Sequence, residues 1–296
     1  MVSWQARVVI AKYWVTRRKQ VFADPGKLRD SAESHQAESV QVPGWVHRRF
    51  DVVESDVLGH RCYTLHPREP ENSQHILYLH GGAYVHQVEQ AHWRFLTRLI
   101  DSTGSVVTRA DLPAGSRARL RRDAGDGLGD LPANPRGSPG PGPDRHGRLR
   151  GRRAEPVRGA ADQAPLPSAA ATSGAVRTLA GPHHDRSGIA ERESHDPFLS
   201  GPGLREAARL YTDGLDQRDP PVSPLFGDLS GLAPISVFTG TRDVLLTDSR
   251  RLRDRIRATG ADIDYEEYPG MFHGWILQTL PEARQATDRV SELVGD

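Results

Sequence analysis

The sequence lacks several features that define common classes of protein. Only one of its 296 residues is a cysteine, Cys62, so no disulfide can form within the chain, which is typical of a reducing compartment. The formal net charge is +1, so no overall field favours nucleic acid or an anionic membrane. The apolar runs of the first twenty residues are short and broken by charge. We therefore expect no signal peptide, no transmembrane segment and a cytoplasmic protein.

Aromatic residues are missing between Phe95 and Phe198, and isoleucine is missing between Ile100 and Ile189. Arginine, glycine, proline and alanine dominate this part of the chain, which therefore has little with which to build a core. The composition predicts an irregular or disordered segment over about residues 110–187. Its string RLRGRR is basic enough to contact nucleic acid, but no aromatic side chains are interleaved for base stacking. We expect no nucleic-acid partner, and keep this function as a minor alternative.

Ordered patterns lie on both sides of that segment. RRFDVVES and RCYTLHP predict an antiparallel pair of strands, and SVVT and DIDYEEY predict two more. HILYLH and PISVFTGTRD have the continuous apolar character of buried strands. Helices are expected over residues 91–102, 202–213, 248–259 and 281–294. Alternating strands and helices predict an α/β fold with a doubly wound, mostly parallel sheet.

The N-terminal residues Trp4 to Phe22 place apolar side chains at helical spacing. We expect an amphipathic helix there. Two interpretations of it stay open. The commoner is a helix that packs on the rest of the protein, and the other is peripheral contact of its basic face with a membrane surface.

Three motifs carry the residue types of an acyl-transfer site. HGGAY, residues 80–84, follows a predicted strand, and its glycines let backbone N–H groups point at a developing oxyanion. GTRD places Asp243 just after a strand, and GMFHGW places His273 on the loop after the next strand. An acid followed by a histidine at successive strand ends is the second half of the nucleophile–acid–base order of an α/β-hydrolase.

Each motif has a simpler interpretation when it stands alone. HGG is often only a turn, an aspartate at a strand end is often a helix cap, and a loop histidine is often merely hydrogen-bonded. The order and spacing of all three favour the catalytic interpretation. The remaining histidines show no ligand spacing with cysteine or acidic residues, so we expect no metal.

Together with DPFLS and VSPLFGDLSGLAP, these motifs resemble the hormone-sensitive-lipase-like branch of the α/β-hydrolases. The resemblance covers about residues 40–110 and 188–296 and keeps the family's motif order. It implies an α/β-hydrolase domain over residues 41–296, interrupted at about 110–187, and a cap-like helical segment over residues 1–40 that covers the acyl pocket. It implies a carboxylesterase or lipase that acts on small-molecule carboxylic esters of short to medium chain length. No cofactor is implied, and a homodimer stays open.

The same resemblance assigns roles to residues. It implies Asp243 as the triad acid, His273 as the base, and the N–H groups of Gly82 and Ala83 as oxyanion-hole donors, with Gly81 completing the loop. Ala83 stands where the family has a third glycine. We regard this as a mild departure, because only the N–H group is needed.

The G-x-S-x-G elbow that carries the nucleophilic serine is absent from the chain. GDLSG, residues 227–231, has the wrong spacing, Ser138 stands beside a proline, and Ser173 follows no apolar run. The place of the elbow falls inside the arginine-rich segment, near Leu149 and Arg150. As written, the chain is expected to be an inactive member of its family and to be poorly soluble. An alternative is a pseudoenzyme that binds esters without cleaving them.

A shifted reading frame would explain the segment. With suitable synonymous codons read from the second base, ADLPAGSRARL gives TYPLAPEHAY, HGRLRGR gives TADSAGG and TLAGPH gives PWLDLT. All three resemble family segments, in the family's order and at one offset, although the third bases are freely chosen. The serine codon would straddle Leu149 and Arg150. We hypothesise two compensating frameshifts, near residues 107–111 and 184–188, arising from a genetic lesion or a sequencing error.

Overall fold

The structure is a computed structural model, and it describes residues 2–37, 41–57, 60–69, 73–111, 186–212, 214–220, 222–232 and 234–295. All of them belong to one structural unit, which comprises Met1–Leu120 and Ala169–Asp296. Nearly all of the segment predicted to be irregular lies outside the described residues, and so do Leu149, Arg150 and the RLRGRR string.

Four strands form the first sheet, in the order β1-β2-β4-β3. β1 (Asp51–Val57) and β2 (His60–His66) form the expected antiparallel pair, and β2 also runs antiparallel to β4 (Val106–Ala110). β3 (His75–Leu79) lies parallel to β4. α5 (Gln90–Thr103) connects β3 to β4 and ends at Gly104, whose φ of 64° is the left-handed conformation that glycine adopts easily at a helix end.

The second sheet is the parallel pair β5 (Ile235–Gly240) and β6 (Ile263–Tyr268). α9 (Leu246–Ala258) connects the two strands and packs on both through Leu252 and Ile256, which join Val237 in one buried cluster. The helix expected over residues 248–259 ends close to the expected place, and Gly260 follows it with a φ of 80°. The buried character predicted for PISVFTGTRD is confirmed in β5.

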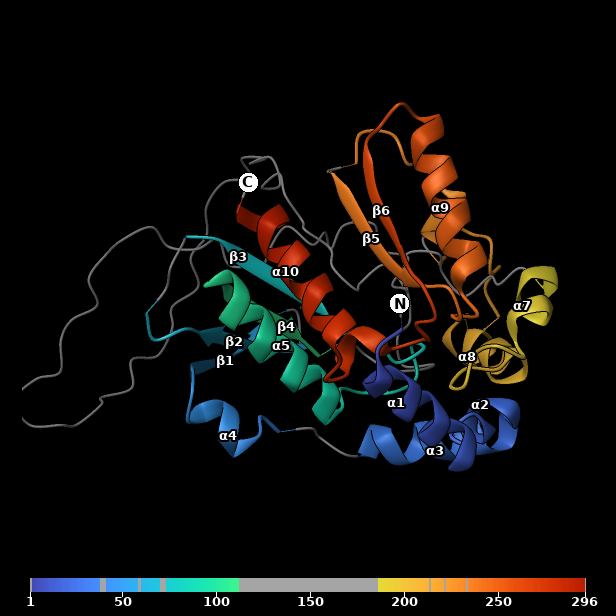
Figure 1. The fold of residues 1–296 in the computed structure, drawn as a ribbon, viewed down its shortest axis with the longest axis horizontal. Helices are drawn as coiled ribbons and strands as arrows, with labels where there is room; N and C mark the ends of the chain where they lie inside the picture. Colours follow the sequence, from blue (N-terminus) through green and yellow to red (C-terminus); the bar gives the residue numbers. More distant parts are fainter. Residues whose placement is uncertain are drawn as a thin grey trace, which may run out of the picture. The chain divides into compact units, whose positions relative to one another are not determined.

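The buried character predicted for HILYLH is wrong for one face of β3. Tyr78 is buried and packs against Phe95 of α5 at 5.8 Å between ring centroids. Leu77 and Leu79, which point to the other face, are 41% and 43% exposed. A parallel strand is buried on both faces only where helices cover both. In Figure 1, α5 and α10 (Pro281–Gly295) lie side by side, and both contribute to the core that buries Tyr78.

The N-terminal helix is shorter than expected. α1 (Trp4–Val15) is capped by Ser3, whose side chain accepts a hydrogen bond from the Ala6 N–H. The chain then turns at Arg17, which has a φ of 50°, before α2 (Gln20–Ala23). Ser3 also ties this end of the chain to α10, because its N–H and hydroxyl groups both donate to the Glu282 carboxylate, at 2.7 and 2.9 Å.

A helical layer follows α1. It consists of α3 (Pro25–Ala37), α7 (Arg186–Arg192) and α8 (Gly201–Thr212), and α2 and α3 both contact α8. A Cβ atom at Gly203 would overlap the backbone of Phe22, so only glycine allows α8 to approach α2 this closely. Shorter elements are α4 (Gly44–His47), η3 (Pro224–Phe226) and η4 (Trp275–Leu277). Within the described ranges, no helix combines the length and apolarity needed to cross a bilayer.

Candidate active site

Asp243 and His273 come from the loops that follow β5 and β6, and they are hydrogen-bonded. The Nδ1 atom of His273 lies 3.1 Å from Oδ2 and 3.2 Å from Oδ1 of Asp243. An Nδ1–H group that donates to a carboxylate leaves Nε2 as the acceptor of the imidazole. Among the described residues, no hydrogen bond uses that Nε2 atom. The pair is therefore arranged to take up a proton at Nε2.

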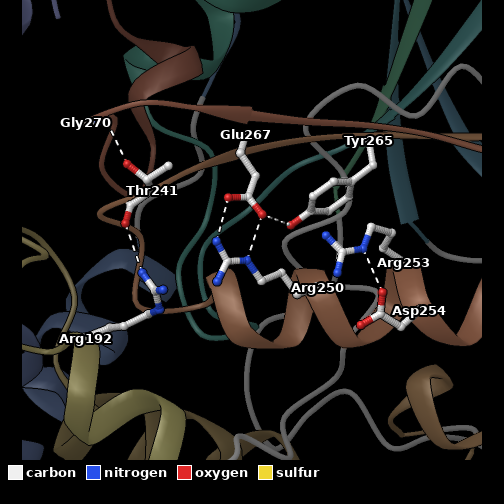
Figure 2. A network of polar contacts seen from close by, with 8 residues as sticks. All are labelled: Arg192, Thr241, Arg250, Arg253, Asp254, Tyr265, Glu267 and Gly270. Carbon is white, nitrogen blue, oxygen red and sulfur yellow. Dashed lines mark hydrogen bonds and ion pairs between the residues drawn. The ribbon is translucent and has the colours of Figure 1, made fainter.

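The two loops are joined to each other just before the pair. Figure 2 shows Thr241, whose hydroxyl accepts a hydrogen bond from the Gly270 N–H at 2.7 Å and whose carbonyl accepts one from Arg192 at 3.0 Å. The backbone adds a bond from the Arg242 N–H to the Met271 carbonyl at 2.9 Å. These contacts fix the separation of the loops, and with it the separation of the acid and the histidine.

A second set of contacts in Figure 2 holds α9 against β6. Arg250 of α9 makes a bidentate pair with Glu267, with both N···O distances at 2.7 Å, and the Tyr265 hydroxyl donates to the same carboxylate at 3.1 Å. Hydrogen bonding to Arg250 holds the pKa of Glu267 below its ordinary value. Bidentate geometry makes such a pair stronger than an ordinary surface ion pair. The helix that follows Asp243 is thus fastened to the strand that leads to His273.

Asp196 is a fully buried carboxylate that supports the acid loop. Its Oδ2 atom accepts the Val244 N–H at 3.0 Å, and its Oδ1 atom accepts the N–H groups of Phe198 and Leu199 at 2.8 and 3.1 Å. Burial and, after it, the negative charge of Asp243 raise the pKa of Asp196 to about 6, against the opposing effects of His273 and the backbone donors. Asp196 therefore positions the residue next to Asp243.

Phe198 connects this carboxylate to the histidine. Its ring stacks on the His273 imidazole, with centroids 6.1 Å apart and an interplanar angle of 6°. Tyr13 of α1 packs on Phe198 at 5.7 Å and on Phe272 at 5.4 Å. The plane of the imidazole is thus set by aromatic contacts as well as by its hydrogen bond.

The glycine-rich loop after β3 adopts an unusual backbone conformation. Gly82, Ala83 and Tyr84 all have positive φ values, of 146°, 52° and 64°. The Gly82 carbonyl accepts the N–H groups of Val85 and His86, which closes a tight turn. Within the described part of the chain, no hydrogen bond uses the N–H groups of Gly82 or Ala83. Two backbone donors are therefore available to a ligand.

A cavity of about 200 Å³ brings the loop and the histidine together. Gly81, Gly82, Ala83 and His273 all line it. Apolar and aromatic side chains from α1, α2, α8 and the 198–199 segment form much of the remaining wall: Tyr13, Val21, Phe22, Phe198, Leu199, Leu204, Ala207 and Ala208. A polar pair also lines it, since Ser31 and His86 lie 3.0 Å apart in a hydrogen bond. An apolar pocket with a few convergent polar groups suits a small organic molecule.

The structure thus brings together every predicted site residue that it describes. The predicted place of the nucleophile, near Leu149 and Arg150, lies outside the described residues. No described serine, threonine or cysteine side chain hydrogen-bonds to His273. Sequence reasoning missed the positioning residues Asp196 and Thr241. The signal for the first was its place in the DPFLS string, and for the second its place within GTRD.

Comparisons with known proteins agree with this geometry. A family model described as the alpha/beta hydrolase fold matches residues 159–277. An acetyl-hydrolase of Streptomyces hygroscopicus is 30% identical over 301 residues, which cover 95% of this chain and 92% of that protein. An esterase of Acinetobacter venetianus is 36% identical over 103 residues, 34% of each chain. A solved esterase of the bacterial hormone-sensitive lipase family has the same fold, with a TM-score of 0.65 at 22% identity over 99% of this chain and 98% of that one.

The chain therefore belongs to the α/β-hydrolases, among the esterase- and lipase-type members of that fold. The fold class predicted from the sequence is confirmed. The likeness to the acetyl-hydrolase extends over nearly the whole of both chains, so it is not confined to the strands and loops around the cavity.

Proposed function

We propose that the cavity is the active site of a serine carboxylesterase whose nucleophile is missing from this chain. Asp243 is the acid that orients His273, and His273 is the general base. The N–H groups of Gly82 and Ala83 form the oxyanion hole, with Gly81 completing the loop. The observation that carries the proposal is that an Asp–His pair with an available Nε2 and a loop with two available N–H groups line or adjoin one cavity.

The residues present account for most steps of ester hydrolysis. A bound ester would place its carbonyl oxygen against the two N–H groups, which stabilise the negative charge that develops on attack. His273 would accept the proton of the attacking hydroxyl at Nε2 and return it to the departing alcohol, while Asp243 stabilises the imidazolium. The hydroxyl itself, normally that of the elbow serine, is what the sequence does not supply.

Loss of that hydroxyl removes the covalent route. In serine hydrolases, deleting the nucleophile lowers the turnover rate by about a millionfold, and deleting the base as well adds little. We expect the purified chain to hydrolyse p-nitrophenyl acyl esters no faster than its His273→Ala variant. Ester hydrolysis that is substantial in the chain as written and lost in His273→Ala would overturn the proposal.

The N-terminal residues 1–40 act in this proposal as a cap over the acyl end of the cavity. Support comes from Tyr13 of α1 and Phe22 of α2, which line the cavity, and from the close packing of α2 on α8 at Gly203. Residues 41–296 then form the hydrolase domain. The size of the cavity, about 200 Å³, suits a short acyl or alcohol group rather than a long chain.

An ester-binding pseudoenzyme is the second candidate, and the cavity is the observation that favours it. A chain with a formed cavity should melt cooperatively, and an unreactive ester analogue that fills the cavity should raise the melting temperature. Replacing Ala207, which lines the cavity, by tryptophan should abolish the rise by filling the space. A flat melt, or a melt that no analogue shifts, would contradict this function without bearing on the proposed roles of Asp243 and His273.

A further inference from the structure

The outer face of α1 is apolar although it faces solvent. Trp4, Val8 and Val15 are 71%, 56% and 83% exposed, and Trp14 is also exposed. These four account for half of the large apolar side chains that are exposed among the described residues. An exposed apolar patch on one element commonly marks a surface that contacts another phase or molecule.

The spacing of Trp4, Val8 and Val15 puts these three on one stripe, whereas Trp14 lies about 80° to the side of Trp4. At about 100° per residue, positions 4, 8, 11 and 15 fall within roughly 60° of the helix circumference. Position 11 is an exposed alanine. Ala6 and Ile10, on the opposite side, are buried in the main core. α1, whose place in the fold Figure 1 shows, therefore has two apolar faces, and only the one with Ala6 and Ile10 is buried.

Cationic side chains flank the stripe. By the same helical geometry, Arg7 lies about 60° to one side of Trp4 and Lys12 lies about 80° to the other. Both are exposed, and so is Arg17 just after the helix. None of the three makes an ion pair with another described residue. Residues 1–23 contain no aspartate or glutamate.

We propose that α1 lies in the plane of an anionic lipid surface, with Trp4, Val8 and Val15 inserted at the level of the headgroups and Arg7 and Lys12 paired with lipid phosphates. An exposed helix face of tryptophan and aliphatic residues edged by cations matches the chemistry of such a surface. Tryptophan suits this depth because its ring is apolar while its N–H group remains hydrogen-bonded.

A second copy of the chain fits the face less well. In a two-fold dimer the same patch meets itself, so the cationic edges of both copies would be brought together with no acidic residue of α1 to neutralise them. An anionic lipid surface instead offers a negatively charged group to each of the cationic side chains beside the stripe. The charge pattern therefore selects the lipid over self-association.

Docking in this way brings the cavity close to the lipid. Tyr13 of α1 and Arg18, just beyond its end, line the cavity. The helix that would contact the lipid thus also forms part of the cavity wall. The inference goes beyond the proposed ester chemistry and does not depend on it, because binding to lipid requires no nucleophile.

The test measures co-flotation of the full-length chain with vesicles. One set contains equal parts of phosphatidylcholine and phosphatidylglycerol, and the other contains phosphatidylcholine alone. We expect binding to the anionic vesicles that weakens with added salt. Replacing Arg7 and Lys12 by glutamine should weaken it about 25-fold, because each basic residue near such a surface contributes about a fivefold factor. Trp4→Ala with Val15→Ser should weaken it by roughly tenfold.

A matched control uses exposed apolar residues away from α1. Val53→Thr with Leu232→Ser removes similar side chains from other surfaces and should leave vesicle binding unchanged. A circular dichroism spectrum and a melting curve verify that each variant keeps the fold. Equal binding by the wild type and both α1 variants would overturn the proposal. So would the absence of vesicle binding together with a dimer that the Trp4→Ala, Val15→Ser variant dissociates, since α1 would then be an interface between copies.

Discussion

Ala83 shows how a single residue can keep a family's geometry at some cost in stability. The resemblance implies a glycine at this position, and the φ of 52° is one that glycine adopts more easily than alanine. A side chain in the left-handed region brings Cβ close to the following carbonyl oxygen, which costs about 1–2 kcal/mol. The N–H group that the proposed oxyanion hole needs is kept, but the backbone that presents it is strained. Alanine at this position therefore keeps the N–H group for the proposed oxyanion hole, but it lowers the stability of the fold.

Replacing Ala83 by glycine should raise the free energy of unfolding by about 1 kcal/mol, because the strain is relieved and only part of the gain is lost to the greater freedom of the unfolded chain. Urea denaturation measures the change. The matched control is Ala11→Gly in the exposed middle of α1, which should lower stability by about 1 kcal/mol through lost helix propensity. If both variants changed the free energy of unfolding in the same direction, the backbone at position 83 would not be strained.

Asp196 makes the stability of the site depend on pH. Its pKa rises from an ordinary value of 3.8 to about 6 in the folded chain, chiefly through burial. The folded state therefore holds more protons than the unfolded state between these values. It follows that the stability contributed by Asp196 is largest below pH 4 and is lost as the pH rises toward 6.

The Asp196→Asn variant tests this dependence. Asparagine can still accept the Phe198 and Leu199 N–H groups through its oxygen, but its amide faces the Val244 N–H, so the variant is less stable than the wild type at pH 4. Because asparagine does not titrate, the unfolding free energy of the wild type should fall relative to that of the variant by about 2 kcal/mol between pH 4 and pH 7. Denaturant melts across that range measure it. A difference that stays constant would show that Asp196 is not protonated in the fold.

Two strand ends, rather than single residues, set the geometry of the Asp243–His273 pair. The end of β5 and the loop after β6 touch at Gly240, the last residue of β5, where a Cβ atom would overlap the Met271 carbonyl. The φ of Gly240 is not positive, so the requirement for glycine is one of space and not of backbone conformation. The pair can meet only because the loops approach this closely.

The Gly240→Ala variant should separate the loops and lower the free energy of unfolding by about 2–3 kcal/mol, as overpacking of a close contact does. Gly81→Ala is the matched control, since Gly81 has open space around its Cβ position and an ordinary φ, and it should change stability little. Thermal melts compare the two. Equal effects would mean that the contact between the loops is not tight.

At the level of elements, the sequence predicts helices correctly wherever apolar residues recur strongly at helical spacing. The helices that follow β3 and β5 and the final helix were all expected, because their apolar residues face the sheets. α3 was missed. It buries little more than Leu28 and Ala32, so its stripe is too thin to detect in a polar sequence. The break after α1 was missed because no glycine or proline marks it.

The site was predictable only in part, for a physical reason. The order and spacing of the motifs identified the Asp243–His273 pair, which the structure brings within hydrogen-bonding distance. Asp196 lies 48 residues from its partner Val244 along the chain, so no local pattern links the two. The exposed face of β3 could not be foreseen either, since burial depends on which helices cover a strand and not on the strand alone.

For the whole molecule, the most important feature is the segment of sequence between β4 and α7. The described strands fall into a group of four and a pair, and β3 stands at the end of the first group. In the proposed reading-frame hypothesis, the segment between them once encoded the elbow. The coding DNA of residues 105–190 tests this hypothesis directly. Codons that cannot spell TADSAGG in the second frame would end the hypothesis.

If the codons permit it, restoring the second frame should restore esterase activity. One base would be removed near codons 107–111 and one added near codons 184–188, which leaves both flanks unchanged. We expect hydrolysis of a p-nitrophenyl acyl ester at about a millionfold above the unrepaired chain's turnover, lost on replacing either the new serine or His273 by alanine. A folded, repaired chain without activity would contradict the proposed roles of the site.

The exposed leucines of β3 also bear on how such an enzyme could be assembled. Within the part of the chain that the structure describes, β3 has a strand partner on one side only, and Leu77 and Leu79 present an apolar surface beside it. An open strand edge accepts another strand whether or not the two share a backbone. The missing portion can therefore be sought as a separate peptide, which makes this chain a starting point for an esterase split between two polypeptides and switched on by their association.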